Sequence, residues 1–97
     1  MNFIYCFTNL INQKKYIGSS CSVNPQRRYA QHLYLVNHPE NKKGQYPLYC
    51  AMRKYGILNF SYTILEYLPD EMTEYEVREI EHNYLIKNNT LSPNGYN

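Results

Sequence analysis

Alternating side chains near the N-terminus predict an antiparallel hairpin. Residues 3 to 8 alternate aromatic side chains with aliphatic, thiol and hydroxyl ones, which places Tyr5 on the aromatic face of a strand. A turn composition follows, and an extended pattern resumes over residues 15 to 18. We therefore expect the two strands to pair, so that Tyr5 approaches Tyr16 in a register that the pattern leaves open.

Helical periodicity and one further strand pattern account for most of the remaining chain. Asn24 before Pro25 is typical of a helix start, and Thr73 with Glu76 three residues later has the pattern of a capping box. The patterns predict helices over residues 25 to 38, 47 to 56 and 74 to 87, a third strand over 60 to 67, and polar loops over 19 to 23 and 39 to 46. This mixture indicates an α+β domain.

The first predicted helix carries two neighbouring stripes of side chains. Its apolar stripe contains Tyr29, Leu33 and Val36, which are expected to face the core. Arg28 and His32 are four residues apart and therefore lie one above the other on the adjacent stripe. A cation and an imidazole are thus expected beside the core.

The last predicted helix places a carboxylate beside its apolar stripe. Glu81 follows Val77 by four residues and precedes Tyr84 by three, so it shares their side of the helix. Burying an unpaired carboxylate costs several kcal/mol, which is comparable to the whole stability of a small domain. We therefore expect a cation or hydrogen-bond donors near Glu81.

Length and composition limit the classes of protein to which the chain can belong. Its 97 residues suit a single domain over residues 1 to 97, and 43% hydrophobic residues indicate a globular protein. A formal charge of +2 permits a polyanionic partner without requiring one. Three widely spaced cysteines argue against a disulfide framework or a structural zinc site. With no signal peptide or membrane span in the pattern, we expect a protein of the cytoplasm or the host-cell nucleoid.

Five short motifs occur in the order and spacing of a known family. They are Phe3-Ile4-Tyr5, Tyr16-Ile17-Gly18, Arg28-x-x-x-His32, Glu81 and Asn94-Gly95-Tyr96-Asn97. Together with a middle segment from Leu48 to Phe60, they resemble the GIY-YIG nuclease superfamily, and most closely the catalytic domains of phage-type homing endonucleases. The resemblance covers essentially the whole chain. It departs at Phe3, which stands where the name motif has its first glycine.

The resemblance implies a fold, a reaction and a set of site residues. The implied fold is a small three-stranded antiparallel sheet flanked by three or more helices, and the implied reaction is metal-dependent hydrolysis of DNA phosphodiester bonds. One Mg²⁺ or Mn²⁺ ion would be held by Glu81. The other residues carried over are Tyr5 as general base or water positioner, Tyr16 as the second tyrosine, Arg28 as the essential arginine, His32 as the helix histidine and Asn97 as the closing asparagine.

These implied roles also have chemical reasons. Mg²⁺ keeps several waters and takes one or two carboxylates plus phosphate oxygens, so Glu81 alone can suffice. The Arg28 guanidinium stays protonated and matches phosphate oxygens in a bidentate geometry. A phenol such as Tyr5 has an ordinary pKa of about 10, so it needs nearby cations to act as a base at neutral pH. Whether Tyr16 and His32 orient Tyr5, relay its proton or contact phosphate is left open.

Other interpretations remain open from the sequence. Taken singly, each of these residues fits an ordinary structural role, and a non-cleaving nucleic-acid-binding or interaction domain is the alternative function. The middle segment favours a homing role over repair or restriction, either in a stand-alone nuclease or in a parent protein with a separate C-terminal DNA-binding region. Basic residues that can contact substrate phosphates or form a solvated face are Arg27, Lys42, Lys43, Arg53 and Lys54.

Overall fold

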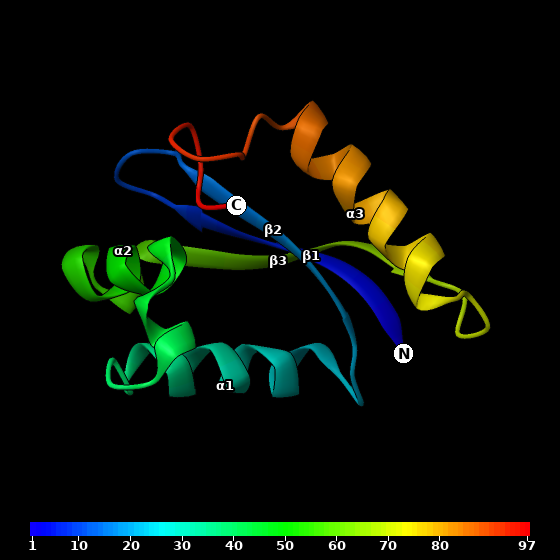
Figure 1. Ribbon diagram of the computed structural model, residues 1–97, viewed down its shortest axis with the longest axis horizontal. Coiled ribbons are helices and arrows are strands. Elements are labelled where there is room, and N and C mark those ends of the chain that lie inside the picture. Colours follow the sequence, from blue (N-terminus) through cyan, green and yellow to red (C-terminus); the bar gives the residue numbers. More distant parts are fainter.

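The computed structural model describes residues 1 to 97 and contains one three-stranded antiparallel sheet with helices on both faces (Figure 1). The strands lie in the order β2-β1-β3, so the N-terminal strand is central. The elements, with η for a 3₁₀-helix, are β1 (Asn2–Asn9), β2 (Lys15–Cys21), α1 (Pro25–Val36), η1 (Lys42–Gln45), α2 (Pro47–Tyr55), η2 (Ile57–Asn59), β3 (Phe60–Leu68) and α3 (Glu74–Lys87). The predicted α+β architecture is confirmed.

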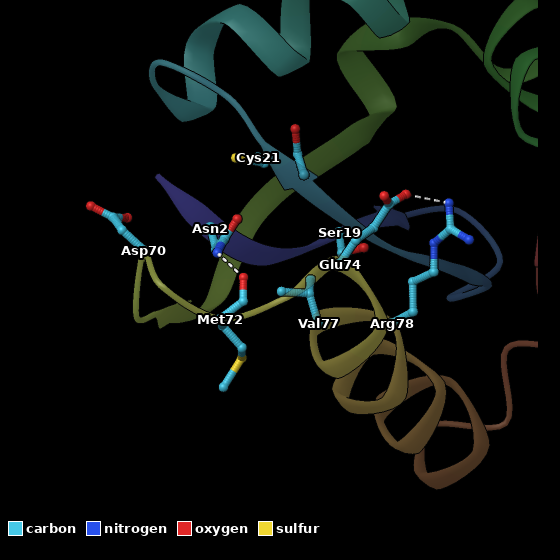
Figure 2. Close-up of a pocket in the computed structure, with 9 residues that line it drawn as sticks. Asn2, Ser19, Cys21, Asp70, Met72, Glu74, Val77 and Arg78 are labelled. Carbon is cyan, nitrogen blue, oxygen red and sulfur yellow. Dashed lines mark hydrogen bonds and ion pairs between the residues drawn. The ribbon is translucent and has the colours of Figure 1, made fainter.

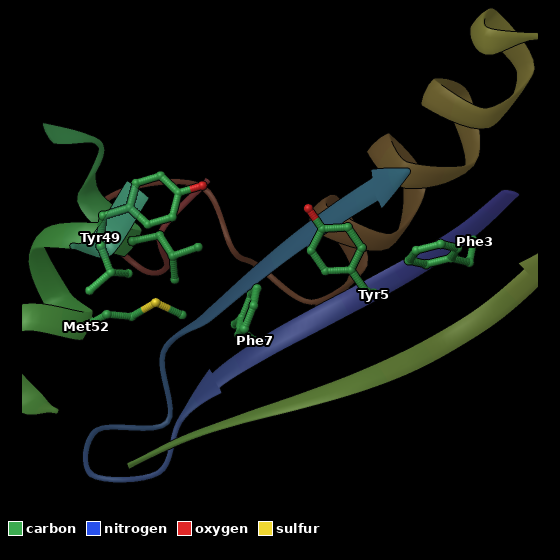
Figure 3. Packing of buried hydrophobic residues seen from close by; sticks show 7 residues of the cluster. Phe3, Tyr5, Phe7, Tyr49 and Met52 are labelled. Atoms are coloured by element: carbon green, nitrogen blue, oxygen red, sulfur yellow. The ribbon is translucent and has the colours of Figure 1, made fainter. Parts of the chain in front are cut away.

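Strand β1 separates two hydrophobic layers because both of its faces are buried. The face that carries Tyr5 packs against α1 and α2 through the cluster Phe3, Tyr5, Phe7, Val36, Leu48, Tyr49 and Met52 (Figure 3). The opposite face packs against α3 through the cluster Ile4, Cys6, Ile17, Leu68, Val77 and Leu85. The alternation along β1 therefore sorts aromatic side chains to one layer and smaller ones to the other.

Strand β2 is longer than its sequence predicts. The polar residues Ser19 and Ser20 were expected in a loop, but they pair with Ile4 and Phe3 of β1, and the strand continues to Cys21. Serine has little intrinsic preference for strands, so here the pairing with a central strand overrides the local composition. The hairpin itself is as predicted.

The segment between α1 and α2 is more ordered than the predicted loop. It contains η1, where the side chain of Asn41 accepts the backbone N–H of Lys43 at 3.0 Å. The guanidinium of Arg53 donates to the carbonyl of Val36 at 3.0 Å and also to the carbonyl of Gly44. Arg53 thus joins the end of α1, η1 and α2, and it has a structural role rather than the phosphate contact suggested by its charge.

The C-terminal residues lie along the outer edge of β2 (Figure 1). The backbone N–H of Tyr96 donates to the carbonyl of Lys15 at 2.9 Å. The side-chain amide of Asn97 accepts the backbone N–H of Ile17 at 2.8 Å and donates to the Ile17 carbonyl at 2.7 Å. These bonds satisfy backbone groups that an edge strand otherwise leaves free.

The helix starts follow the predicted caps. Asn24 accepts the N–H of Arg27 at 2.8 Å, and Thr73 and Glu76 form a reciprocal capping box at the start of α3. Helix α1 ends two residues before the predicted boundary, which lies within the usual variation of helix ends. None of the helices combines the length and apolarity that a membrane crossing requires.

Replacing Thr73 by alanine is expected to lower the free energy of unfolding by about 1 kcal/mol, because the N–H of Glu76 loses its acceptor. For a domain of this size the corresponding decrease in Tm is about 4 to 8 °C. Thermal unfolding followed by circular dichroism measures the change. Thr73→Ser keeps the acceptor oxygen and should retain most of the stability; equal losses in the two variants would contradict the capping assignment.

Candidate active site

Tyr5 and Tyr16 approach each other diagonally across the β1–β2 hairpin. Tyr5 pairs with Gly18, and Phe7 pairs with Tyr16, so the two tyrosines lie on the same face, offset along the strands. Their ring centroids are 6.3 Å apart. The register that the sequence left open thus brings the two predicted tyrosines together.

Gly18 provides the space that the Tyr5 ring occupies. A Cβ atom at position 18 would lie 2.5 Å from both Cζ and Oη of Tyr5, well inside van der Waals contact. The glycine of the second tyrosine motif is therefore a steric requirement of the first. The sequence motif identifies this glycine, but the steric reason for it becomes visible only when β1 and β2 are paired.

The hydroxyl of Tyr5 joins two residues of α1. Tyr5 is 0% exposed, its Oη lies 2.7 Å from Nε2 of His32, and Nε of Arg28 donates to it at 3.1 Å. Burial raises the pKa of Tyr5, and although Arg28 acts in the opposite direction, burial outweighs it. The sequence-based expectation of a lowered pKa is therefore not met by Arg28, and Tyr5 carries its proton at neutral pH.

His32 is the most buried residue of α1, and its ring is held on both sides. It is 1% exposed, with Nε2 at Tyr5 and Nδ1 2.6 Å from Oη of Tyr49. Burial, reinforced by the charge of Arg28, lowers the pKa of His32 to about 3, so the imidazole is neutral. The buried face of α1 thus runs through His32 and Val36, whereas Leu33 of the predicted stripe is only half-buried.

Tyr49 is the member of this cluster that the sequence did not indicate. It lies in the first buried cluster at 5% exposure and belongs to α2, so it contacts His32 from a different element. Burial raises its pKa to about 12, which keeps its hydroxyl protonated. Its position inside the middle motif carried no chemical signal, because a tyrosine next to a buried leucine is an ordinary core pattern.

Arg28 has part of its guanidinium engaged and part free. Nε donates to Tyr5, and Nη1 donates to Gln31 Oε1 at 3.0 Å, whereas Nη2 has no hydrogen-bond partner within the chain. The side chain is half-buried, and its guanidinium carbon lies 5.8 Å from the centroid of the Tyr5 ring. Arg28 is therefore anchored at the site with one terminal nitrogen available for an anion.

Glu81 reaches the same region from the other side of the sheet. It belongs to α3, which contacts β2, and its side chain is half-buried. Neither of the two ion pairs in the chain includes Glu81, so the cation expected beside it is not supplied by ion pairing within the protein. Burial raises the pKa of Tyr16, and the charge of Glu81 raises it further, which places that carboxylate close to the second tyrosine.

A cavity of about 320 Å³ opens next to these residues. It is lined by Tyr16, Tyr46, Pro47, Leu48, Tyr49, Tyr96 and Asn97. Another cavity, of about 370 Å³, lies between the end of β2 and the start of α3, and Figure 2 shows its residues, which include Asn2, Ser19, Cys21, Asp70, Met72, Glu74, Val77 and Arg78. The second cavity contains none of the predicted site residues.

The remaining predicted residues lie outside the tyrosine cluster. Both polar atoms of the Asn97 side-chain amide form hydrogen bonds with the backbone of Ile17, next to Tyr16. Asn97 therefore holds β2 in position. The basic residues that remain as candidates for phosphate contact are all exposed: Arg27, Lys42, Lys43 and Lys54. They come from α1, η1 and α2, on the helical layer that covers the face of Tyr5.

Comparison with known proteins identifies the family. A model of the GIY-YIG catalytic domain matches residues 1 to 97. The chain belongs to the GIY-YIG family. A protein of Neurospora crassa named "Probable intron-encoded endonuclease 1" is 35% identical over 94 residues, which are 97% of this chain. The match spans 27% of that relative, so the chain covers about a quarter of its length.

Solved structures agree with this GIY-YIG assignment. The catalytic domain of the homing endonuclease I-TevI superposes with a TM-score of 0.80 at 25% identity, over 100% of this chain and 97% of that one. A mutant of the catalytic domain of the intron endonuclease I-TevI gives the same TM-score at 26% identity, over 100% of this chain and 93% of that one. The sheet and helices predicted for the GIY-YIG fold are therefore confirmed.

Gly18→Ala is expected to destabilise the domain by about 1 to 3 kcal/mol, because the added Cβ overlaps the buried Tyr5 ring. Urea unfolding measures the loss. Ser19→Ala, at the next position of the same strand, is the control and should stay within about 0.5 kcal/mol of the wild type. Equal stabilities of the two variants would contradict the packing of Tyr5 over Gly18.

The neutral, buried state of His32 predicts a loss of stability in mild acid. The unfolded chain takes up a proton on this histidine below an ordinary pKa of about 6.5, whereas the folded chain, with a pKa of about 3, does not. Stability from this group is complete above that ordinary value and decreases as the pH falls towards 3. Between pH 7 and pH 5 we expect it to account for about 2 kcal/mol.

Urea unfolding at both pH values in the wild type and in His32→Gln tests this difference, since the other titrating groups are common to the two proteins. The variant should lose less stability on acidification. As a second measurement, NMR titration of the wild type should show a His32 ring that does not titrate above pH 5, and titration near pH 6.5 would contradict the assignment.

Proposed function

We propose that this chain is a metal-dependent DNA endonuclease domain that hydrolyses phosphodiester bonds, in the manner of a homing endonuclease catalytic module. The observation that carries the proposal is the convergence of Tyr5, Tyr16, Arg28 and His32 on one face of the sheet, with the unpaired carboxylate of Glu81 close to Tyr16. An anchored guanidinium, a hydrogen-bonded phenol and imidazole, and an unpaired carboxylate are groups that can stabilise charge and transfer protons in phosphodiester hydrolysis. The names of the Neurospora and I-TevI relatives agree with such an activity.

The residues present fit one hard divalent cation whose coordination shell consists mostly of water and substrate oxygens. No three His, Cys, Asp or Glu side chains are grouped closely enough to hold a metal by themselves. Glu81 is a half-buried carboxylate with no ion-pair partner, and Mg²⁺ or Mn²⁺ at such a site completes its shell with waters and phosphate oxygens. When bound, the ion would neutralise negative charge that develops on the phosphate.

Arg28 supplies the positive charge that the chain itself contributes. Its Nη2 is free to bind a non-bridging phosphate oxygen, while its bond to Tyr5 holds the guanidinium in place. An anchored cation loses little freedom when the charge of the transition state develops, so its contribution is large. Because Nε is engaged with Tyr5 and Nη1 with Gln31, the contact with phosphate uses Nη2 rather than the full bidentate fork.

Tyr5 acts as a neutral phenol rather than as a phenolate. Its raised pKa excludes a standing negative charge, so it accepts a proton from the attacking water only if its own proton leaves at the same time. Tyr5 is 0% exposed in the free chain, so this water has to enter beside its hydroxyl when the substrate binds. Nε2 of His32 lies 2.7 Å away and can receive that proton. The general base is therefore the Tyr5–His32 pair, and Tyr16 and Asn97 hold the adjoining strand against it.

Contact with DNA rests on charge rather than on sequence reading. The exposed basic residues Arg27, Lys42, Lys43 and Lys54 can bind backbone phosphates, which gives affinity that falls steeply with salt and little discrimination between sequences. The match to only 27% of the Neurospora relative leaves room for a separate DNA-binding region in a longer parent protein. We place target recognition in such a region.

The test is nicking of a supercoiled plasmid at low salt with Mg²⁺, with and without EDTA. We expect cleavage that EDTA abolishes and that Glu81→Gln or Arg28→Ala reduces by at least about 100-fold, because each removes charge stabilisation from the transition state. Glu79→Gln makes the same chemical change on the exposed side of α3 and should cut like the wild type.

Two results would reject parts of this proposal. Cleavage in EDTA, or full activity of Glu81→Gln, would exclude the metal role of Glu81. Plasmid binding without cleavage, in the wild type as in the variants, would replace the nuclease by a nucleic-acid-binding domain that keeps the fold.

A further inference from the structure

The ring of His32 is held between two phenols that come from different layers of the fold. Nε2 lies 2.7 Å from the hydroxyl of Tyr5 on β1, and Nδ1 lies 2.6 Å from the hydroxyl of Tyr49 on α2. Figure 3 shows the hydroxyls of Tyr5 and Tyr49 turned towards each other across the core. The proposed function assigns a role to Nε2, which faces Tyr5, but none to the hydrogen bond between Nδ1 and Tyr49.

A neutral imidazole has one proton for its two nitrogens, so the two phenols compete to set its position. If Nε2 carries the proton, Tyr5 receives hydrogen bonds from both His32 and Arg28, and its own hydroxyl proton is left with the neighbouring Tyr16 hydroxyl, to which it forms no hydrogen bond of normal geometry. If Nδ1 carries the proton, it is donated to Tyr49, and Nε2 accepts the proton of Tyr5. Every buried donor is then satisfied, which favours the second arrangement by the cost of an unpaired hydroxyl.

Tyr49 can accept this proton because its own hydroxyl proton has another outlet. Tyr49 lines the cavity of about 320 Å³ beside the site, where water can accept its hydroxyl proton. Tyr5 does not line this cavity, and the hydrogen bonds of its hydroxyl are to His32 and Arg28. The asymmetry between the two phenols therefore decides which nitrogen of His32 is protonated.

We propose that Tyr49 is a positioning residue that holds His32 in the Nδ1-protonated tautomer and so keeps Nε2 open to the proton of Tyr5. The inference rests on the proposed nuclease function and adds a residue to its machinery. Tyr49 contacts neither the attacking water nor the phosphate; it acts through His32. A histidine in the wrong tautomer cannot accept a proton from Tyr5, and a catalytic triad loses most of its activity for the same reason when its histidine takes the wrong tautomer.

The proton transfers balance without any further reactant. As the water oxygen bonds to phosphorus, the water proton passes to Oη of Tyr5, and the Tyr5 proton passes to Nε2 of His32. The Nδ1 proton then moves to Tyr49, whose hydroxyl proton is released to water in the cavity. The bond from phosphorus to the leaving oxygen breaks, and that oxygen takes a proton from solvent.

The first test reads the tautomer directly and needs no cleavage. In ¹⁵N NMR spectra of the DNA-free protein at neutral pH, His32 should show a protonated Nδ1 and an unprotonated Nε2. In Tyr49→Phe the fixed tautomer should be lost, so that the two nitrogen shifts move towards each other. A protonated Nε2 in the wild type, or unchanged shifts in the variant, would overturn the inference.

The second test asks whether the tautomer matters for the reaction. Tyr49→Phe keeps the buried ring, so we expect plasmid nicking with KM unchanged and kcat lower by about 10- to 100-fold, within the range of acid–base contributions. The solvent isotope effect on kcat should also become smaller, since fewer protons move together. An unchanged kcat or isotope effect would overturn the inference.

Tyr62→Phe is the matched control for both tests. Tyr62 packs in the same aromatic cluster, with its ring centroid 5.6 Å from that of Tyr5, and its hydroxyl donates to the carbonyl of Pro25 at 2.9 Å rather than to His32. The Tyr62→Phe variant should keep the wild-type tautomer and kcat. If its kcat decreases as much as that of Tyr49→Phe, the decrease reflects a general effect on packing, and the inference is overturned. If the wild type does not cut DNA, the proposed function fails, and the NMR result alone decides whether Tyr49 sets the tautomer.

Discussion

The hydroxyl of Tyr5 is the group on which the rest of the site depends. A phenol that is 0% exposed must have its hydrogen bonds met inside the protein, and here His32 and Arg28 meet them. That requirement fixes how α1 lies on the sheet, because both partners come from successive turns of this helix. It also explains Gly18, since the ring that carries the hydroxyl occupies the space of a side chain there. Packing and polar satisfaction thus select the same arrangement.

The edge strand β2 connects the two layers of the fold. Tyr16 faces α1 and α2, while α3 on the opposite face contacts β2 and brings Glu81 near that tyrosine. An edge strand is the natural place for such a meeting, because only there can a side chain on one face lie close to a helix on the other. The amide of Asn97 holds the backbone of Ile17 and so stabilises this edge. The Glu81 carboxylate and the tyrosine cluster are therefore positioned by one strand.

Sequence patterns within a few residues predicted most helices and strands and part of the site. The remaining features depend on how strands and helices pair in space. The alternation along β1 and the caps at Asn24 and Thr73 act within a few residues, so they are readable from the sequence. Ser19 and Ser20 gave the wrong prediction, because their strand conformation comes from pairing with β1. The sequence predicted His32 beside the core rather than within it. Burying a histidine requires hydrogen-bond partners for both ring nitrogens, and these cannot be seen in the sequence. Tyr49 supplies one of them from another helix, which no spacing along the chain could indicate.

The motif positions differ in how freely they can change, and the structure gives the reasons. Phe3 stands where the name motif has glycine, yet it is fully buried, and its ring centroid lies 6.0 Å from that of Tyr5. The larger side chain packs there among the aromatic residues of the first cluster. At Gly18 the same change meets Tyr5 at 2.5 Å, so no side chain is tolerated without moving the hydroxyl. A fold that superposes at a TM-score of 0.80 with 25% identity can thus exchange core residues, while the positions that fix the Tyr5 hydroxyl cannot be exchanged without altering the site.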